Sequence, residues 1–148
     1  VEQDYSEALR LYKLSADQGF IIPQINLANL YYSGLGVEQD YSEAVKWFKL
    51  AAEQGDAIAQ TSLGYMYGTG SGVTQDYIEA VRLYKLSSDQ GNNFGQFNLA
   101  FMYEKGTGIG QDYSEALRLY KLAADQGNSK AQNNIGYMYG TGTGVGQD

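Results

Sequence analysis

A phrase of eight residues returns along this chain at a fixed interval of 36 residues. It reads Val-Glu-Gln-Asp-Tyr-Ser-Glu-Ala at Val1 and Val37, and close variants begin at Val73 and Ile109. Four repeats therefore fill residues 1–36, 37–72, 73–108 and 109–144, and residues 145–148 open a fifth. A period of this length is typical of stacked helical repeats, none of which buries its apolar face alone. The repeat predicts a single repeat domain over residues 1–148.

Each repeat contains two helical patterns, for which the second repeat serves as the example. Asp40 with Glu43 has the spacing of a capping box, apolar residues then recur at helical intervals, and Gly55 stands at the position of a C-terminal cap. We name this first pattern the outer helix. An inner helix follows from about Ala57 to Tyr67, with Asp56 as its N-cap, and the glycines of residues 68–72 supply the turn into the next repeat. We predict eight helices between about Tyr5 and Tyr139, without strands: an all-α, α/α superhelical solenoid of four 36-residue helix-turn-helix repeats.

The combined pattern resembles the sel-1-like repeat, a relative of the tetratricopeptide repeats, over the whole chain. It is carried by Ala59-Gln60, Leu63-Gly64 and Tyr67, by the Gly-x-Gly-Val turn of residues 70–73, by Asp76-Tyr77 and by Ala-Ala-Glu-Gln-Gly at residues 51–55. The resemblance implies an adaptor or assembly platform. One departure is the stretch Phe20-Ile21-Ile22-Pro23-Gln24, where the pattern prefers Asp-Ala-x-Ala-Gln. Some bacterial relatives carry paired cysteines and are linked to β-lactam binding, an activity that a chain without cysteine does not favour.

The composition removes several classes of function. The sequence has no Cys and no His, so it lacks thiolate nucleophiles, disulfides, the usual general base and the usual metal ligands. The net charge of −7 argues against nucleic acid and anionic membranes, and no apolar run is long enough for a membrane helix. We predict no catalytic residue, no metal and no cofactor. No localisation is indicated beyond compatibility with a soluble protein of the cytoplasm.

Three further patterns have a plain structural interpretation. The glycine tracts at Gly68, Gly106 and Gly140 lack the Gly-Lys-Ser/Thr ending of a phosphate loop and recur as turns. The carboxylate pairs of each outer helix, such as Asp40 and Glu43, are explained by capping rather than by acid–base or calcium chemistry. Eight of the ten basic residues lie on outer helices among acidic neighbours, which indicates a solvated face.

The inner helices carry the candidate binding surface. Gln60, Leu63, Gly64 and Tyr67 share one side of the helical wheel, and the opposite side differs from repeat to repeat while the outer helices hardly change. By resemblance to tetratricopeptide arrays, this variable side lines a concave groove. The candidate partner-binding residues are Ile22, Ile25, Asn26 and Asn29 in the first repeat, Ile58, Thr61, Ser62 and Tyr65 in the second, Phe94, Phe97, Asn98 and Phe101 in the third, and Asn133, Asn134 and Tyr137 in the fourth. The alternative is that the aromatic rings only pack against the next inner helix.

We therefore predict a non-catalytic scaffold that binds a peptide or a partner helix in its groove, centred on the third repeat. The acidic balance indicates a neutral or basic partner. Two alternatives are a purely structural array without a specific ligand and a small-molecule or cell-wall binder or hydrolase of the β-lactam type. Because the chain starts on an outer helix and closes on an inner one, we also predict head-to-tail self-association through the two uncapped ends.

Overall fold

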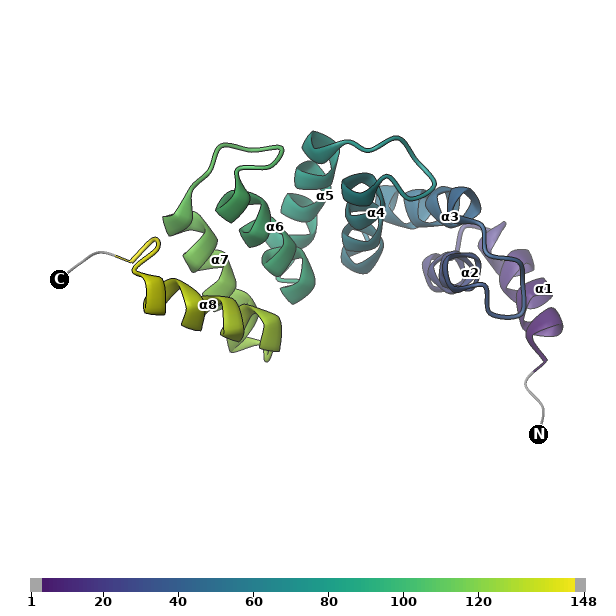
Figure 1. Ribbon diagram of the computed structural model, residues 1–148. Helices are drawn as coiled ribbons and strands as arrows, with labels where there is room; N and C mark the ends of the chain where they lie inside the picture. Colours follow the sequence, from purple (N-terminus) through teal and green to yellow (C-terminus); the bar gives the residue numbers. More distant parts are fainter. Residues whose placement is uncertain (1–3, 146–148) are drawn as a thin grey trace. The chain divides into compact units, whose positions relative to one another are not determined.

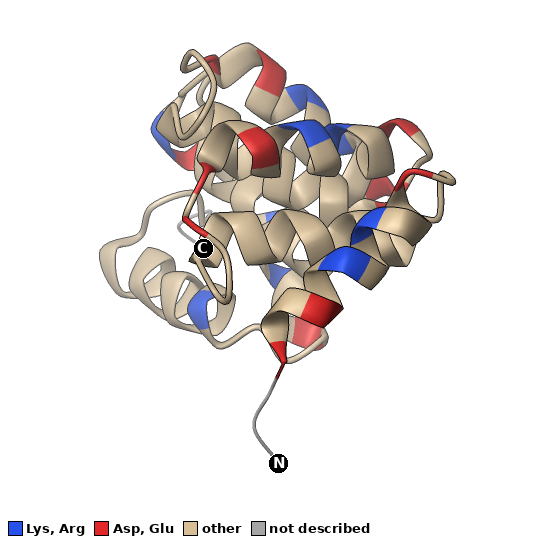
Figure 2. Ribbon diagram, turned by 90° about the vertical axis from the view of Figure 1, so that its right-hand side faces the viewer, with Lys and Arg blue, Asp and Glu red and all other residues tan. Residues whose placement is uncertain are grey.

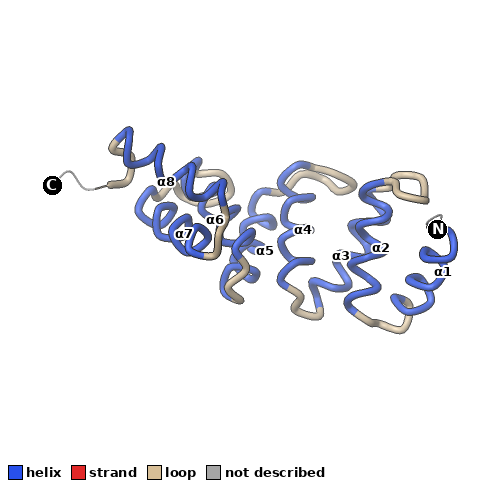
Figure 3. Tube along the Cα trace, turned by 90° about the horizontal axis from the view of Figure 1, so that it is seen from below, coloured by secondary structure: helices blue, strands red, loops and turns tan. Residues whose placement is uncertain are grey.

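The structure, a computed structural model, describes residues 4–145 and contains eight α-helices and no strand in this part of the chain (Figures 1 and 3). Outer and inner helices alternate along the chain, as predicted. They are α1 (Tyr5–Ala16), α2 (Ile21–Ser33), α3 (Tyr41–Glu53), α4 (Ala57–Thr69), α5 (Tyr77–Asp89), α6 (Asn93–Lys105), α7 (Tyr113–Asp125) and α8 (Ser129–Thr141). Of the predicted start of a fifth repeat, residues 146–148 lie outside the described residues.

Each outer helix begins after an aspartate that caps it. Asp40 Oδ1 accepts a hydrogen bond from the Glu43 N–H at 3.0 Å, and Asp4, Asp76 and Asp112 repeat this bond. The second hydrogen bond of the predicted capping box, from the Asp40 N–H to the Glu43 side chain, is not formed, so this part of the prediction is wrong. The Glu43 side chain pairs with Lys46, and the Asp40 N–H donates to the Tyr31 carbonyl at 2.9 Å. Glu7, Glu79 and Glu115 likewise pair with the arginine three residues later. The aspartates are thus caps, and the glutamates are members of surface ion pairs.

The inner helices end on glycine in the left-handed region. Gly70 caps α4 with φ 73°, and Gly34, Gly106 and Gly142 cap the other three. The predicted end of α4 near Tyr67 is two residues short, because Gly68 still belongs to the helix and the left-handed residue is Gly70. Gly72 also has positive φ, and a Cβ there would lie 2.3 Å from the Tyr41 carbonyl carbon. This turn therefore requires glycine both for its conformation and for its close approach to the start of α3, the outer helix of the same repeat.

The chain divides into two compact units of two repeats each, Val1–Gln75 and Asp76–Asp148. In the N-terminal unit, α2 packs against α1 and α3, and α3 packs against α4. Its core contains Leu27, Ala28, Ala44, Phe48 and Leu63, all buried. The single domain predicted for residues 1–148 stays a prediction.

In the C-terminal unit, α6 packs between α5 and α7, and α7 packs against α8. The core here is formed by small residues beside large ones, such as Ala116 beside Leu117 and Ala100 beside Leu99. Tyr120 of α7 is wholly buried. This alternation of small and large side chains lets neighbouring helices approach closely.

A hydrogen-bonded pair of glutamine side chains, one buried and one exposed, joins neighbouring repeats. In the N-terminal unit, Gln54 Nε2 of α3 donates to Gln24 Oε1 of α2 at 2.9 Å. In the C-terminal unit, Gln126 Nε2 of α7 donates to Gln96 Oε1 of α6 at the same distance. Gln24 and Gln96 are buried, so the outer helix of the following repeat satisfies an amide that would otherwise be costly to bury.

Helices α1 and α8 expose faces that are buried in the equivalent helices. Leu11 of α1 is 50% exposed, whereas Leu119, at the same register of α7, is 1% exposed. On α8, Gln132 and Gly136 are exposed, whereas their equivalents on α6, Gln96 and Ala100, are buried. None of the described helices is long and apolar enough to cross a membrane.

Candidate functional site

The phase of each inner helix separates a packing side from an exposed side. On α4, the Asp56 carboxylate accepts from the Ala59 N–H at 2.8 Å and fixes the start of the helix. Gln60, Leu63 and Gly64 are then buried, whereas Ile58 lies on the opposite side and is exposed. This is the two-sided arrangement that the helical wheel predicts.

In the N-terminal unit, the predicted binding residues form one stripe on α2 and one on α4. Ile22 and Ile58 are 72% and 58% exposed, and Asn29 and Tyr65 are exposed two helical turns further along the same helices. Ile25, Asn26, Thr61 and Ser62 are half-buried between them. Neither helix contains a charged residue, so these two stripes are uncharged and combine apolar side chains with neutral polar ones.

In the C-terminal unit, the predicted residues occupy the same registers of α6 and α8. Phe94 and Phe101 of α6 are 61% and 43% exposed, and Tyr137 of α8 is 67% exposed. Asn133 is exposed, whereas Asn98 and Asn134 are half-buried. Three aromatic rings thus reach solvent on two inner helices of one unit, whereas a packed core would cover them.

Phe97 differs from the other two phenylalanines of α6. It is half-buried, and its ring centroid lies 5.6 Å from that of Tyr120 on α7, with the planes tilted by 50°. This geometry is a favourable packing contact between aromatic rings. Phe97 therefore ties α6 to the outer helix α7, whereas the alternative interpretation of the sequence expected packing against the next inner helix. Phe94 and Phe101 remain exposed to solvent.

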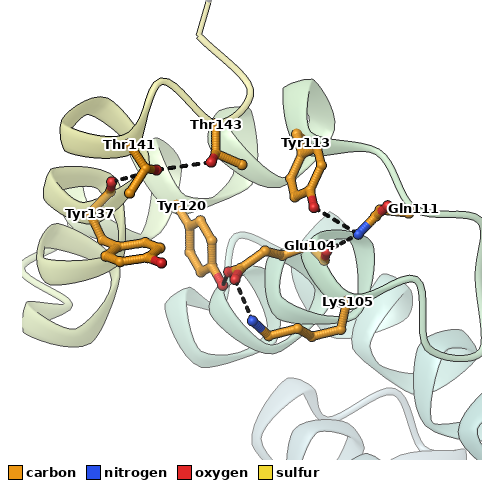
Figure 4. Close-up of polar contacts among 8 residues, drawn as sticks. All are labelled: Glu104, Lys105, Gln111, Tyr113, Tyr120, Tyr137, Thr141 and Thr143. Atoms are coloured by element: carbon orange, nitrogen blue, oxygen red, sulfur yellow. Dashed lines mark hydrogen bonds and ion pairs between the residues drawn. The ribbon is translucent and has the colours of Figure 1, made fainter.

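A polar cluster beside this surface was not predicted from the sequence (Figure 4). The buried Tyr120 hydroxyl donates to Glu104 Oε2 at 2.7 Å, and Lys105 Nζ donates to Glu104 Oε1, also at 2.7 Å. The Lys105 ammonium lies 5.5 Å from the centroid of the Phe101 ring, within the range of a cation–π contact. The sequence did contain a sign of this cluster, because Glu104 replaces the glycine that the second and fourth repeats have at the same position, Gly68 and Gly140.

The cluster shifts the ionisation of its members. Burial, followed by the hydrogen bond to Glu104, raises the pKa of the Tyr120 phenol well above its usual range, and a hydrogen bond with Asn134 of α8 acts in the opposite direction. The hydrogen bond with Glu104 raises the pKa of Lys105. Tyr120 is therefore a neutral phenol at physiological pH, and Lys105 keeps its positive charge.

The charges of the chain are divided unequally between the two kinds of helix (Figure 2). Glu104, Lys105 and Lys130 are the only charged residues within the inner helices. The outer helices carry the other eight basic residues among their acids, in ion pairs such as Arg118 with Glu115 at 2.6 Å. Within residues 4–145, no three Asp or Glu side chains come close enough together to hold a metal ion.

The chain matches the family model of the Sel1 repeat in five segments, residues 1–20, 24–56, 57–92, 94–128 and 129–148. It matches none of the curated proteins with which it was compared. Among solved structures, a Sel1 repeat protein from Oxalobacter formigenes is 36% identical, with a TM-score of 0.90 over 100% of this chain and 60% of that one.

Two further structures are similar. A protective antigen of uropathogenic Escherichia coli strains, described as displaying an SLR fold, is 41% identical with a TM-score of 0.88, over 90% of this chain and 29% of that one. Cysteine-rich protein B of Helicobacter pylori is 18% identical with a TM-score of 0.68, over 88% of this chain and 93% of that one, and supports the fold alone. The chain thus spans less than two thirds of the length of the two more identical proteins.

Proposed function

Because this chain belongs to the Sel1 repeat family, we propose that it is a non-catalytic scaffold that binds a peptide or a partner helix on the exposed side of its inner helices. Proteins of this family are generally protein-interaction scaffolds. The binding surface comprises the stripes of α2 and α4 in the N-terminal unit and those of α6 and α8 in the C-terminal unit. The richest part is the aromatic pair Phe94 and Phe101 with Tyr137.

The observation that carries this proposal is the exposure of large apolar side chains that differ from repeat to repeat. At one register of the inner helices, Ile22, Ile58 and Phe94 all reach solvent, and the fourth repeat has Lys130 there. The outer helices also expose a leucine at one shared register, at Leu14, Leu50, Leu86 and Leu122, but it is the same residue every time. A surface that recognises a particular partner needs differences along its length. On the outer helices Ile78 of α5 is also exposed where the other repeats have serine, but the inner stripes differ at every one of their registers.

Two substitutions of similar exposure test this assignment. Phe101 and Leu86 are 43% and 40% exposed and belong to an inner and an outer helix of the same unit. Peptides are first selected from a displayed random library against residues 1–148, and their affinity is then measured by calorimetry. We expect Phe101→Ala to weaken binding by about 2 kcal/mol, or about thirtyfold in Kd, and Leu86→Ala to leave it unchanged.

The opposite pattern, in which Leu86→Ala weakens binding and Phe101→Ala does not, would place the site on the outer helices. Melting temperatures of both variants should stay close to that of the unaltered chain, since neither side chain is buried. Phe97→Ala is unsuitable for this purpose because its ring packs on Tyr120, so its loss would lower stability as well.

We also propose that residues 1–148, taken as an isolated chain, associate head to tail. Helix α1 has the same sequence as the corresponding twelve residues of α7, except for Ser15 in place of Ala123. In the C-terminal unit, α7 packs on α6, and Gln126 reaches Gln96. The exposed face of α8 presents Gln132 at the register of Gln96, and α1 of a second copy would supply Gln18 at the register of Gln126.

A further inference from the structure

The charged groups that the inner helices of the C-terminal unit expose to a partner are the ammonium groups of Lys105 and Lys130. Glu104 is the one carboxylate on α6 and α8, its side chain is only 14% exposed, and both of its oxygens already accept hydrogen bonds, from Tyr120 and Lys105. The Lys105 side chain is 50% exposed, and an ammonium group has three donors, of which Glu104 takes one. Lys105 therefore retains donors for a partner, whereas the Glu104 carboxylate is largely shielded from solvent and is already bonded at both oxygens.

The stripes of α6 and α8 meet at Tyr120. Its hydroxyl bonds to Glu104 at the end of α6 and to Asn134 in the middle of α8. Figure 4 shows Tyr137 on one side of Tyr120 and Lys105 on the other. The exposed Tyr137 ring and the exposed Lys105 ammonium thus lie on either side of Tyr120, where an apolar side chain and a carboxylate could be bound next to each other.

The local charge here is opposite to the net charge. Helices α6 and α8 carry Lys105 and Lys130 against Glu104, although the whole chain carries −7. Within residues 4–145, Lys130 takes part in no ion pair, and it lies one turn before the exposed Asn133. Because charge interactions at the surface are screened beyond about 8–10 Å at physiological salt, the charged groups at the site affect the preference more than the net charge of the whole chain does.

We propose that the inner face of α6 and α8 binds an acidic peptide segment, in which an Asp or Glu lies close to a large aliphatic or aromatic residue. The apolar side chain contacts Phe101 and Tyr137, the carboxylate accepts from Lys105 or Lys130, and Asn133 offers its amide to the peptide backbone. This inference rests on the proposed function and narrows it, because it replaces the neutral or basic partner suggested by the net charge with an acidic one.

The experiment is a selection from a displayed library of random peptides against residues 1–148, with the enriched sequences made as peptides blocked at both ends. Blocked ends exclude capture of a terminal carboxylate. We expect enrichment of Asp and Glu beside Leu, Phe, Trp or Ile, and binding that weakens as salt is added. Lys130→Glu and Lys105→Gln should each lower the affinity of these peptides about tenfold or more.

The matched control is Lys85→Glu, which makes the same change of charge on an exposed position of the outer helix α5. It should leave the affinity unchanged, and circular dichroism should show all variants folded. Selection of basic or uncharged peptides that still depend on Phe101 would overturn the acidic preference and leave the proposed function standing. Peptides that do not depend on Phe101 would overturn the inference. If Ile58→Ala on α4 does not weaken their binding either, or if no peptide is enriched, the proposed function is overturned as well.

Discussion

Tyr120 is the residue at which the polar contacts of the C-terminal unit converge, and its ionisation gives a pH signature. Tyrosine in an unfolded chain ionises near pH 10, and the pKa of Tyr120 in the folded chain is higher, first because of burial. Below about pH 10 this group adds no pH dependence to stability. Above it, the unfolded chain releases a proton that the folded chain retains, so stability falls by up to about 1.4 kcal/mol per pH unit until the folded pKa is reached.

The measurement is urea unfolding at a series of alkaline pH values. Tyr120→Phe should cost about 1–2 kcal/mol at neutral pH, because Glu104 and Asn134 each lose a partner, and should flatten the alkaline slope. Tyr113→Phe serves as control, since its hydroxyl is bonded to Gln111 on the exposed surface. If both variants keep the slope of the unaltered chain, the alkaline loss belongs to other tyrosines.

The sequence was most informative about single residues wherever helix phase decides their surroundings. Ile22, Ile58 and Phe94 are exposed because each occupies the side of its helix opposite the buried glutamine and leucine. Phase does not reveal that Phe97 packs on Tyr120 or that Glu104 meets the same tyrosine. Those contacts join helices through their crossing, which depends on side chains 16 or more residues apart.

At the scale of helices, the caps make a prediction that separates two carboxylates three residues apart. Asp40→Ala removes the acceptor for the Glu43 N–H at the start of α3 and should destabilise the chain by about 0.5–2 kcal/mol, measured by chemical unfolding. Asp40→Asn keeps a side-chain acceptor and should cost much less. Glu43→Ala should also cost less than Asp40→Ala, because Glu43 contributes a surface ion pair with Lys46. A loss at Glu43 equal to that at Asp40 would restore a capping role for Glu43.

A helix boundary could be predicted from the sequence where a single residue can form the cap. It was predicted less accurately where two residues could form it. Each outer helix starts after its aspartate, as expected. The end of α4 is set by Gly70 rather than Gly68, because helical hydrogen bonding continues until the residue that adopts positive φ. Helix α2 starts at Ile21 without a side-chain cap, and Pro23 is accommodated because it falls in the first turn, where its missing N–H costs nothing.

At the scale of the whole molecule, the 36-residue period is sufficient to predict the class of fold. Every repeat brings the same small residues to the same helix crossings, so one crossing explains the next, as between α2 and α3 and between α6 and α7. The period alone does not predict which residues form a binding surface, because the specificity of such a surface depends on the positions at which the repeats differ. Glu104, Lys105 and Lys130 are such differences, and they place a local positive charge on an acidic chain.

The exposed faces of α1 and α8 lead to a prediction about association. If α1 of one copy docks on α8 of another as α7 docks on α6, Leu11 becomes buried like Leu119, and Gln18 and Gln132 form the amide pair. Light scattering of residues 1–148 should then show a mass that rises with concentration without reaching a fixed oligomer, since a head-to-tail contact does not close. Leu11→Lys should keep the chain monomeric because it would bury an unpartnered charge. Leu14→Lys, at 53% exposure one turn further along α1, should not, because the equivalent Leu122 stays exposed on the packed helix α7. A constant monomer mass up to millimolar concentration, or equal effects of the two lysines, would exclude this mode of association.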